Sequence, residues 1–172
     1  MKHTTLFTSV CIVIAAMLQG CNKSETAAAF ETENWQRRIV NISPADSLES
    51  GQTYLPVYSE IYSRNDQRTE QLTATVSMRN TSADSIYILD ASYFDTKGHL
   101  IKSYFDKPIY LAPMETVEII IADTDKKGGT GANFIFDWKI KPGTPLPLFE
   151  AIMISTSGSM GISFTSRGIR TK

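Results

Sequence analysis

Cysteine and histidine are scarce in this chain of 172 residues, which has two of each. Cys11 and Cys21 both lie near the start, and His99 is the only histidine beyond them. Downstream of Cys21 the chain can therefore form neither a disulfide nor a cysteine-containing zinc site. A Ser-His-Asp triad would depend on His99 alone, and no GxSxG motif supplies the serine. The sequence thus predicts no catalytic residue, no metal site and no cofactor.

Excess charge is also absent, because the formal net charge is −1 and the pI is about 6.1. Binding to nucleic acid needs a basic surface that neutralises phosphates, so the sequence predicts no nucleic-acid partner. The composition, with 42% hydrophobic and 20% charged residues, is that of a folded domain and excludes a chain that is disordered throughout.

The longest hydrophobic run, residues 6–18 (LFTSVCIVIAAML), is too short for the roughly 20 residues of a membrane-spanning helix. It follows Lys2, as the apolar part of a secretory signal peptide does. The run ends in LQGC (18–21), which resembles the lipobox of bacterial lipoproteins, although Gln19 departs from the usual small or β-branched residue. We therefore predict a signal peptide over residues 1–20 and lipidation of Cys21. The alternative is cleavage by the ordinary signal peptidase.

The lipid on Cys21 would anchor the protein to a membrane of the bacterial cell envelope, since several acyl chains give stable attachment. Asn22 resembles the residue that directs lipoproteins to the periplasmic side of the outer membrane, if the host is Gram-negative. Residues 21–50 are mostly polar and are expected to form the lipidated N-terminus and a tether to a domain at 51–172. Whether residues 35–42 (WQRRIVNI) dock on that domain as a strand stays open.

Strands are predicted from Tyr54 onward. Residues 72–80 (LTATVSMRN) alternate between apolar and polar, which indicates an antiparallel strand with one buried face. In residues 95–98 (DTKG), Asp95 is expected to bond the local backbone and Gly98 to adopt a left-handed conformation. The other predicted strands are 86–94, 99–105, 117–122, 133–140, 149–156 and 162–169.

About eight short strands, separated by Gly, Pro, Asn and Asp and without a helical stripe, predict an all-β fold: an antiparallel β-sandwich, with a small β-barrel as the alternative. The stretch from Leu72 to Leu100 resembles the Ig-like domains of bacterial envelope proteins.

Five segments occur in an order that resembles an uncharacterised bacterial family, the domain of unknown function three-one-two-four. They are YLPVYSEIY (54–62), LTATVSMRNT (72–81), YFDTKG (93–98), GGTGANFIFDW (128–138) and GISFTSRG (161–168). The resemblance covers about 115 residues, essentially the whole predicted domain. It implies a secreted or lipid-anchored β domain with no assigned activity, and it identifies no functional residue.

The glycines of GGTGAN (128–133) suggest a phosphate-binding loop, but the pattern differs from one. The two lysines precede the glycines, no GK[ST] follows, and the loop leads into a predicted strand rather than a helix. We therefore expect a tight turn and no bound nucleotide. Asp123 and Asp125 are spaced as in a calcium loop, but the lysines that follow oppose a cation, so a solvated loop is expected.

Asp137 and Glu150 interrupt apolar strands, and Arg167 could lie on the same surface. The three residues are the candidate polar binding patch. Our first hypothesis is a non-catalytic, lipid-anchored sandwich that binds a protein or another component of the envelope. The alternative is a hydrolase or sugar-binding protein that acts on envelope glycans through surface carboxylates. Outward-facing ion pairs without a function are the third interpretation.

Overall fold

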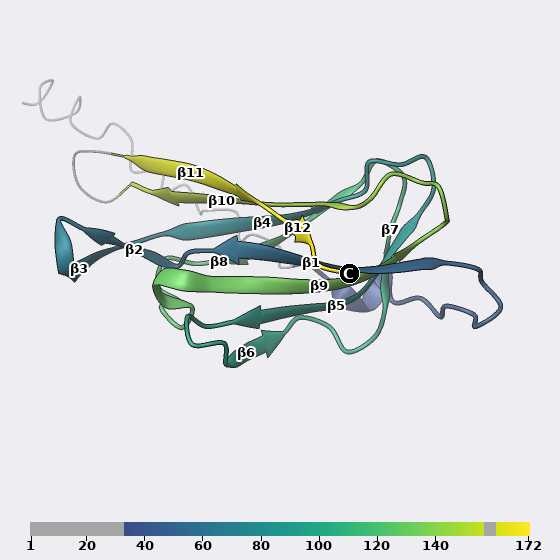
Figure 1. Ribbon diagram of the computed structural model, residues 1–172, viewed down its shortest axis with the longest axis horizontal. Coiled ribbons are helices and arrows are strands. Elements are labelled where there is room, and N and C mark those ends of the chain that lie inside the picture. The colour runs from purple at the N-terminus through teal and green to yellow at the C-terminus, as the bar shows by residue number, and fades with distance from the viewer. Residues whose placement is uncertain (1–32, 157–160) are drawn as a thin grey trace, which may run out of the picture. The chain divides into compact units, whose positions relative to one another are not determined.

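The computed structural model describes residues 33–156 and 161–172, so the predicted signal peptide and Cys21 lie outside the described residues. Two antiparallel sheets pack face to face, and neither closes into a barrel (Figure 1). This arrangement confirms the prediction of an all-β sandwich.

The large sheet has the strand order β12-β1-β9-β5-β6, with β7 also paired to β5. The small sheet has the order β11-β10-β4-β8, and β2 and β3 form a separate hairpin. The bounds are β1 Glu49–Val57, β2 Glu60–Ser63, β3 Asn65–Gln71, β4 Thr73–Arg79, β5 Ile86–Phe94, β6 Leu100–Ser103, β7 Ile109–Leu111, β8 Thr116–Ile121, β9 Ala132–Ile140, β10 Leu148–Ser155, β11 Ile162–Arg167 and β12 Ile169–Arg170. Two short 3-10 helices are η1 Trp35–Arg38 and η2 Gly129–Gly131.

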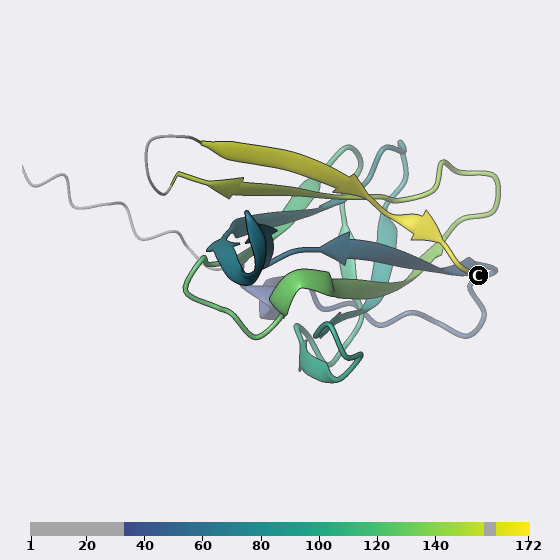
Figure 2. The ribbon, with the colours of Figure 1, turned by 60° about the vertical axis from the view of Figure 1, so that its left-hand side comes forward.

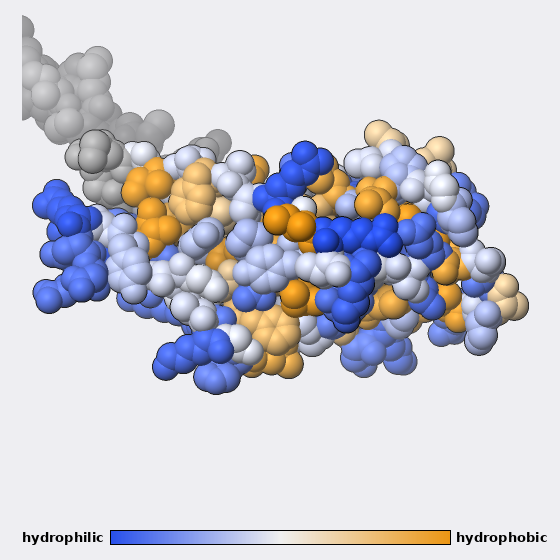
Figure 3. Space-filling model, in the orientation of Figure 1, coloured by the Kyte–Doolittle hydropathy of each residue, from blue (hydrophilic) through white to orange (hydrophobic). Residues whose placement is uncertain are grey.

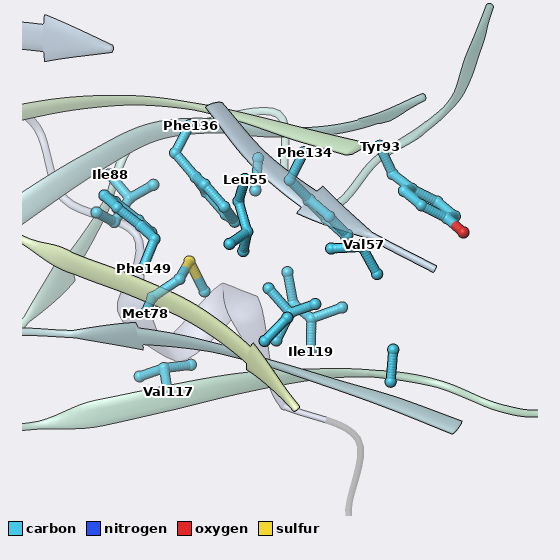
Figure 4. Packing of buried hydrophobic residues seen from close by; sticks show 14 of the residues in the cluster. Leu55, Val57, Met78, Ile88, Tyr93, Val117, Ile119, Phe134, Phe136 and Phe149 are labelled. Carbon is cyan, nitrogen blue, oxygen red and sulfur yellow. The ribbon is translucent and has the colours of Figure 1, made fainter. Parts of the chain in front are cut away.

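The core lies between the two sheets, where alternate residues of the strands point inward (Figure 4). β9 carries three of the largest, Phe134, Phe136 and Trp138, each at most 1% exposed. Phe136 stacks on Phe149 of the small sheet, with ring centroids 4.3 Å apart. Because aromatic rings bury a large apolar area, this row explains how the domain is stable without a disulfide.

Trp138 lies across Gly51, its partner on the neighbouring strand β1. A Cβ atom at residue 51 would be only 2.2 Å from Cζ2 of the indole ring. Trp138 Nε1 donates a hydrogen bond to Thr53 Oγ1 at 2.9 Å, which satisfies the buried indole and fixes the ring. Glycine at position 51 is therefore required by the close approach of the ring, not by a turn.

The described part of the predicted tether, residues 33–50, contacts the sandwich. The ring of Trp35 packs 5.3 Å from that of Phe105, and Arg38 forms an ion pair with Glu115 at 2.8 Å. Ile39 makes a single β-bridge to β7. The segment thus docks as a 3-10 turn and one bridge rather than as a strand, and β1 begins two residues before the predicted domain boundary.

The last two strands belong to different sheets. β11 pairs with β10 in the small sheet, and after Gly168 the chain continues as β12 beside β1 in the large sheet (Figure 2). The Gly168 N–H donates to the Phe149 carbonyl at 2.8 Å, and a Cβ at 168 would lie 2.6 Å from Thr53 Cγ2. Glycine is required where the chain crosses between the sheets, because no side chain fits there.

Asn80 holds the turn after β4 together. Its Nδ2 atom donates to the carbonyl oxygens of Asp84, Leu111 and Ala112 at 2.8, 3.2 and 2.8 Å. Its Oδ1 atom accepts from the backbone N–H and the hydroxyl of Ser82, both at 2.9 Å. The side chain is 3% exposed and uses both of its polar atoms, so it links the β4–β5 turn to the end of β7.

The described part of the chain forms twelve strands instead of about eight. The predicted strands correspond to β4, β5, β6, β8, β9, β10 and β11, whereas no pattern in the sequence predicted β7 or the β2–β3 hairpin. The strand predicted at 162–169 is divided at Gly168, and Ile169 belongs to β12. β3 (NDQRTEQ) has no buried residue, so no apolar alternation marks it. Within residues 33–156 and 161–172, no helix has the length and hydrophobicity that crossing a membrane requires.

Candidate functional site

The structure brings two of the three predicted patch residues together. Glu150 on β10 and Arg167 on β11 are directly opposite each other on the outer face of the small sheet. Asp137 lies on β9, in the large sheet, and points away from the core on the other side of the sandwich. Asp137 and Glu150 therefore cannot act on one bond, and the geometry gives no support to a glycosidase that uses this pair.

Asp137 faces another carboxylate, Asp90, across the β5–β9 ladder. Sequence alternation could not predict that Asp90 lies opposite Asp137, because the β5–β9 register shifts between Ile88 and Asp90. Asp90 accepts hydrogen bonds from two serine hydroxyls, Ser92 and Ser103, and Asp137 accepts one from Gln52 Nε2 at 2.9 Å. Like charges directly opposite each other are destabilising, and these hydrogen bonds offset the repulsion.

Glu150 has a cationic neighbour on the other side, because Arg79 Nε lies 3.6 Å from its carboxylate. Both side chains are more than a third exposed, so this pair contributes under about 1 kcal/mol. Arg167 is exposed and, in the described part of the chain, forms no ion pair within 4 Å. Of the three predicted residues, Arg167 is therefore the one whose charge is free to bind a ligand.

The carbonyl groups of the glycine-rich loop accept hydrogen bonds from neighbouring segments of the same chain. The carbonyl of Gly128 accepts from the Thr96 backbone N–H and hydroxyl at 3.1 and 2.9 Å. The carbonyl of Gly129 accepts from Ser59 in the same way, and Gly129 has a φ of 72°. Three of the five ordered segments, 54–62, 93–98 and 128–138, thus meet at one end of the sandwich. The loop is a tight turn, as predicted.

The hydroxyl of Tyr93 lies under this loop, 2.0 Å from where a Cβ of residue 128 would be, so only glycine fits there. Tyr93 is 1% exposed, and its ring stacks on Phe134 at 4.8 Å (Figure 4). Burial, with a further contribution from the negative charge of Asp125, raises the pKa of Tyr93 to about 12. The side chain stays neutral at every physiological pH and serves in packing.

The other carboxylates that could bind a metal ion, Asp95 and Asp125, accept hydrogen bonds from the backbone of their own turns. Asp95 Oδ1 accepts from the backbone N–H groups of His99 and Lys97, both at 2.8 Å, and these bonds lower the pKa of Asp95. Gly98 has a φ of 81°, as predicted for this hairpin. Asp125 Oδ1 accepts from the Lys127 N–H at 3.1 Å. Across residues 33–156 and 161–172, no three His, Cys, Asp or Glu side chains are grouped so that they could hold a metal.

The outer face of the small sheet carries an apolar area that we call the isoleucine face. Thr165, Ile152, Thr75 and Ile120 form one row across its four strands. Ile154 lies beside this row, and the three isoleucines are 42–51% exposed. In Figure 3, hydrophobic residues reach the surface over β10 and β11. The Glu150–Arg167 pair borders this face, so it combines an apolar centre with charges at its margin.

A second feature is a pocket of about 260 Å³ where the chain crosses from β11 to β12, which we call the corner pocket. The lining residues come from both sheets and from the loop before β10: Thr53, Thr81, Trp138, Leu146, Pro147, Leu148, Phe149, Arg167, Gly168 and Arg170. The sequence identified Arg167 here and missed Arg170 and Trp138. Only the crossing of the last strand brings these two residues to the same place as Arg167.

The fold defines the class of protein: an all-β, antiparallel sandwich domain with a docked N-terminal segment. The family described as "Protein of unknown function (DUF3124)" matches residues 50–171, and the chain belongs to that family, as the five ordered segments predicted. No curated protein matches the sequence. Among solved structures, the crystal structure of Thermotoga maritima 1070 is similar, with a TM-score of 0.47 and 7% identity over 69% of this chain and 92% of that chain.

Proposed function

We propose that this protein is a lipid-anchored component of the bacterial cell envelope that binds a partner protein through its β-sandwich and performs no catalysis. The isoleucine face is the observation that carries the proposal. Isoleucine side chains that are close to half exposed on β8 and β10 flank Thr75 of β4, the strand between them, and together form an apolar surface of the kind that marks interaction sites. The attachment through Cys21 rests on the lipobox alone.

The partner expected is a protein with an apolar surface of similar size and charged groups at its margin. Thr75 and Ile152 lie on the central strands β4 and β10, which are paired on both sides, whereas Ile120 lies on the edge strand β8, which pairs with β4. A parallel row, two residues further along each strand on the same face, contains Glu118, Glu150 and Arg167 and so carries both signs of charge. Apolar contact gives the affinity, and the charges fix the orientation of the partner.

Substitution of the isoleucines tests the binding proposal. A photo-reactive amino acid at Thr75, in the middle of the face, should give a cross-linked product in living cells. Ile152→Glu should abolish that product, whereas Ile169→Glu, a control on β12 that is 67% exposed and outside the face, should leave it unchanged. Products that survive Ile152→Glu would contradict the proposal, as would a product that contains only two copies of this chain.

The anchor is tested separately. Labelled palmitate should enter the wild-type protein, and Cys21→Ala should abolish both the labelling and the retention of the protein in membranes. Label in the alanine variant would refute the anchor without affecting the test of the isoleucine face.

A further inference from the structure

We propose that the corner pocket binds a small ligand with one carboxylate and an adjacent apolar group, about the size of one or two amino-acid residues. The pocket shares Arg167 with the margin of the isoleucine face, but none of the three isoleucines lines it. Its walls include Thr53, Trp138 and Phe149, which are buried between the two sheets. The inference does not depend on the function proposed above.

The charge of the pocket is positive. Two arginines, Arg167 and Arg170, and no acidic residue are among the lining residues that the structure describes. Arg170 is already engaged: Nη2 contacts Glu49 at 2.9 Å, Nε donates to the Lys172 carbonyl at 2.5 Å, and the guanidinium lies 5.1 Å from the Trp138 ring centre. Arg167 is therefore the cation left to bind an anion.

One free arginine matches one negative charge. A guanidinium can bind a carboxylate through two parallel hydrogen bonds, and this geometry gives both affinity and orientation. A phosphate dianion carries more charge than the uncompensated arginine supplies, because the Arg170 charge is balanced by Glu49. The charge balance favours a carboxylate.

Apart from Thr53 and Thr81, the other side chains that line the pocket are apolar. Leu146, Pro147 and Leu148 come from one side, and Phe149 and Trp138 belong to the core. A volume of about 260 Å³ lies just below the roughly 300–1,000 Å³ of sites for drug-sized molecules, so the occupant is small. An apolar group beside the carboxylate would cover Leu146, which is 44% exposed without a ligand.

The walls of the pocket are rigid. Gly168 is held by its hydrogen bond to Phe149, and the Trp138 ring by its bond to Thr53. Because Gly168 leaves no room for a side chain, residues on either side of it, Arg167 and Ile169, are fixed in direction by the strand crossing. The backbone that carries Arg167 is thus fixed in advance, whereas its exposed side chain becomes ordered only when a ligand binds.

Calorimetric titration of the full-length protein in a nonionic detergent tests the inference, with N-acetyl-leucine as the probe. N-acetyl-leucinamide, which has the same apolar group without the charge, should bind at least about tenfold more weakly, since a charge-assisted hydrogen bond is lost. Arg167→Gln should weaken the binding of N-acetyl-leucine by a similar factor. Arg68→Gln, a control at a 59% exposed arginine of the β2–β3 hairpin, should have no effect.

A second variant blocks the pocket without removing a charge. Thr81 is exposed at the pocket margin, so Thr81→Phe should fold normally and fill the space. Loss of N-acetyl-leucine binding in this variant would support the inference. No binding to the wild type, equal binding of the acid and the amide, unchanged binding in Arg167→Gln, or equally tight binding of inorganic phosphate would each overturn it.

Discussion

Gly51→Ala should destabilise the protein by about 1–5 kcal/mol, although it adds only a methyl group. The new Cβ would lie 2.2, 2.3 and 2.7 Å from three atoms of the Trp138 ring, whereas carbon atoms in contact are about 3.5 Å apart. The ring must therefore move by roughly 1 Å or more. Such overpacking costs about 1–3 kcal/mol. The same movement breaks the buried Nε1–Thr53 bond, at about 1–3 kcal/mol. The lower chain entropy of alanine offsets only about 0.5–1 kcal/mol.

Urea unfolding followed by far-ultraviolet circular dichroism measures this effect. Gly161→Ala is the matched control: its Cβ would meet nothing closer than 3.8 Å, so a change within about 0.5 kcal/mol is expected. Trp138→Leu removes the ring, and in that background Gly51→Ala should cost much less, which gives a coupling energy above about 1 kcal/mol. A cost below about 1 kcal/mol for Gly51→Ala in the wild type would refute the steric reasoning.

Three further predictions concern buried polar groups and charges. Asn80→Ala removes the donor to three carbonyls and the acceptor of one N–H, and of these groups the Asp84 carbonyl keeps a bond from the Ser82 hydroxyl, so the change should cost about 3–5 kcal/mol in urea unfolding. Asn65→Ala, at the exposed first residue of β3, should cost under about 1 kcal/mol, and similar costs for the two variants would contradict the role of Asn80. Tyr93 has a pKa of 10 in the unfolded chain and about 12 in the folded one, so its contribution to the free energy of unfolding is complete below pH 10 and is lost as the pH rises toward 12. Tyr93→Phe should reduce this loss of stability at alkaline pH, and an unchanged dependence of stability on pH would contradict the prediction. Asp137→Asn keeps the acceptor for Gln52 and removes the charge opposite Asp90. It should therefore raise the free energy of unfolding by about 0.2–0.5 kcal/mol at low salt. A loss of stability would contradict the repulsion between the two carboxylates.

The fold class could be predicted because the buried strands show their pattern in the sequence. β9 alternates strictly between buried and partly exposed residues, and β4 does so except at Ser77, which is buried as well. This side-chain period of two is local information. The β2–β3 hairpin escaped prediction since its second strand is polar on both faces, and β7 has three residues. The docking of Trp35 could not be read from the sequence either, because the aromatic cluster that receives it is assembled from distant segments.

The candidate site was harder to predict than the fold. Alternation correctly placed Asp137, Glu150 and Arg167 on outward faces, but not on which sheet each would lie. Sheet membership depends on the pairing of strands far apart in the chain, such as β1 with β9, and no local pattern encodes it. Arg170 could not have been grouped with Trp138 for the same reason, since 32 residues separate them in the sequence.

The crossing of the last strand between the sheets has a consequence for the order of folding. β11 adds to β10, and β12 adds to β1, whose partner β9 is synthesised about 80 residues after β1 itself. Pairing of strands so far apart in the sequence is slow, because the chain loses the entropy of loop closure before the stabilising contacts form. The sandwich therefore cannot be completed while the C-terminal ten residues are still missing. A chain threaded through a membrane from its N-terminus would stay incomplete until nearly all of it had emerged.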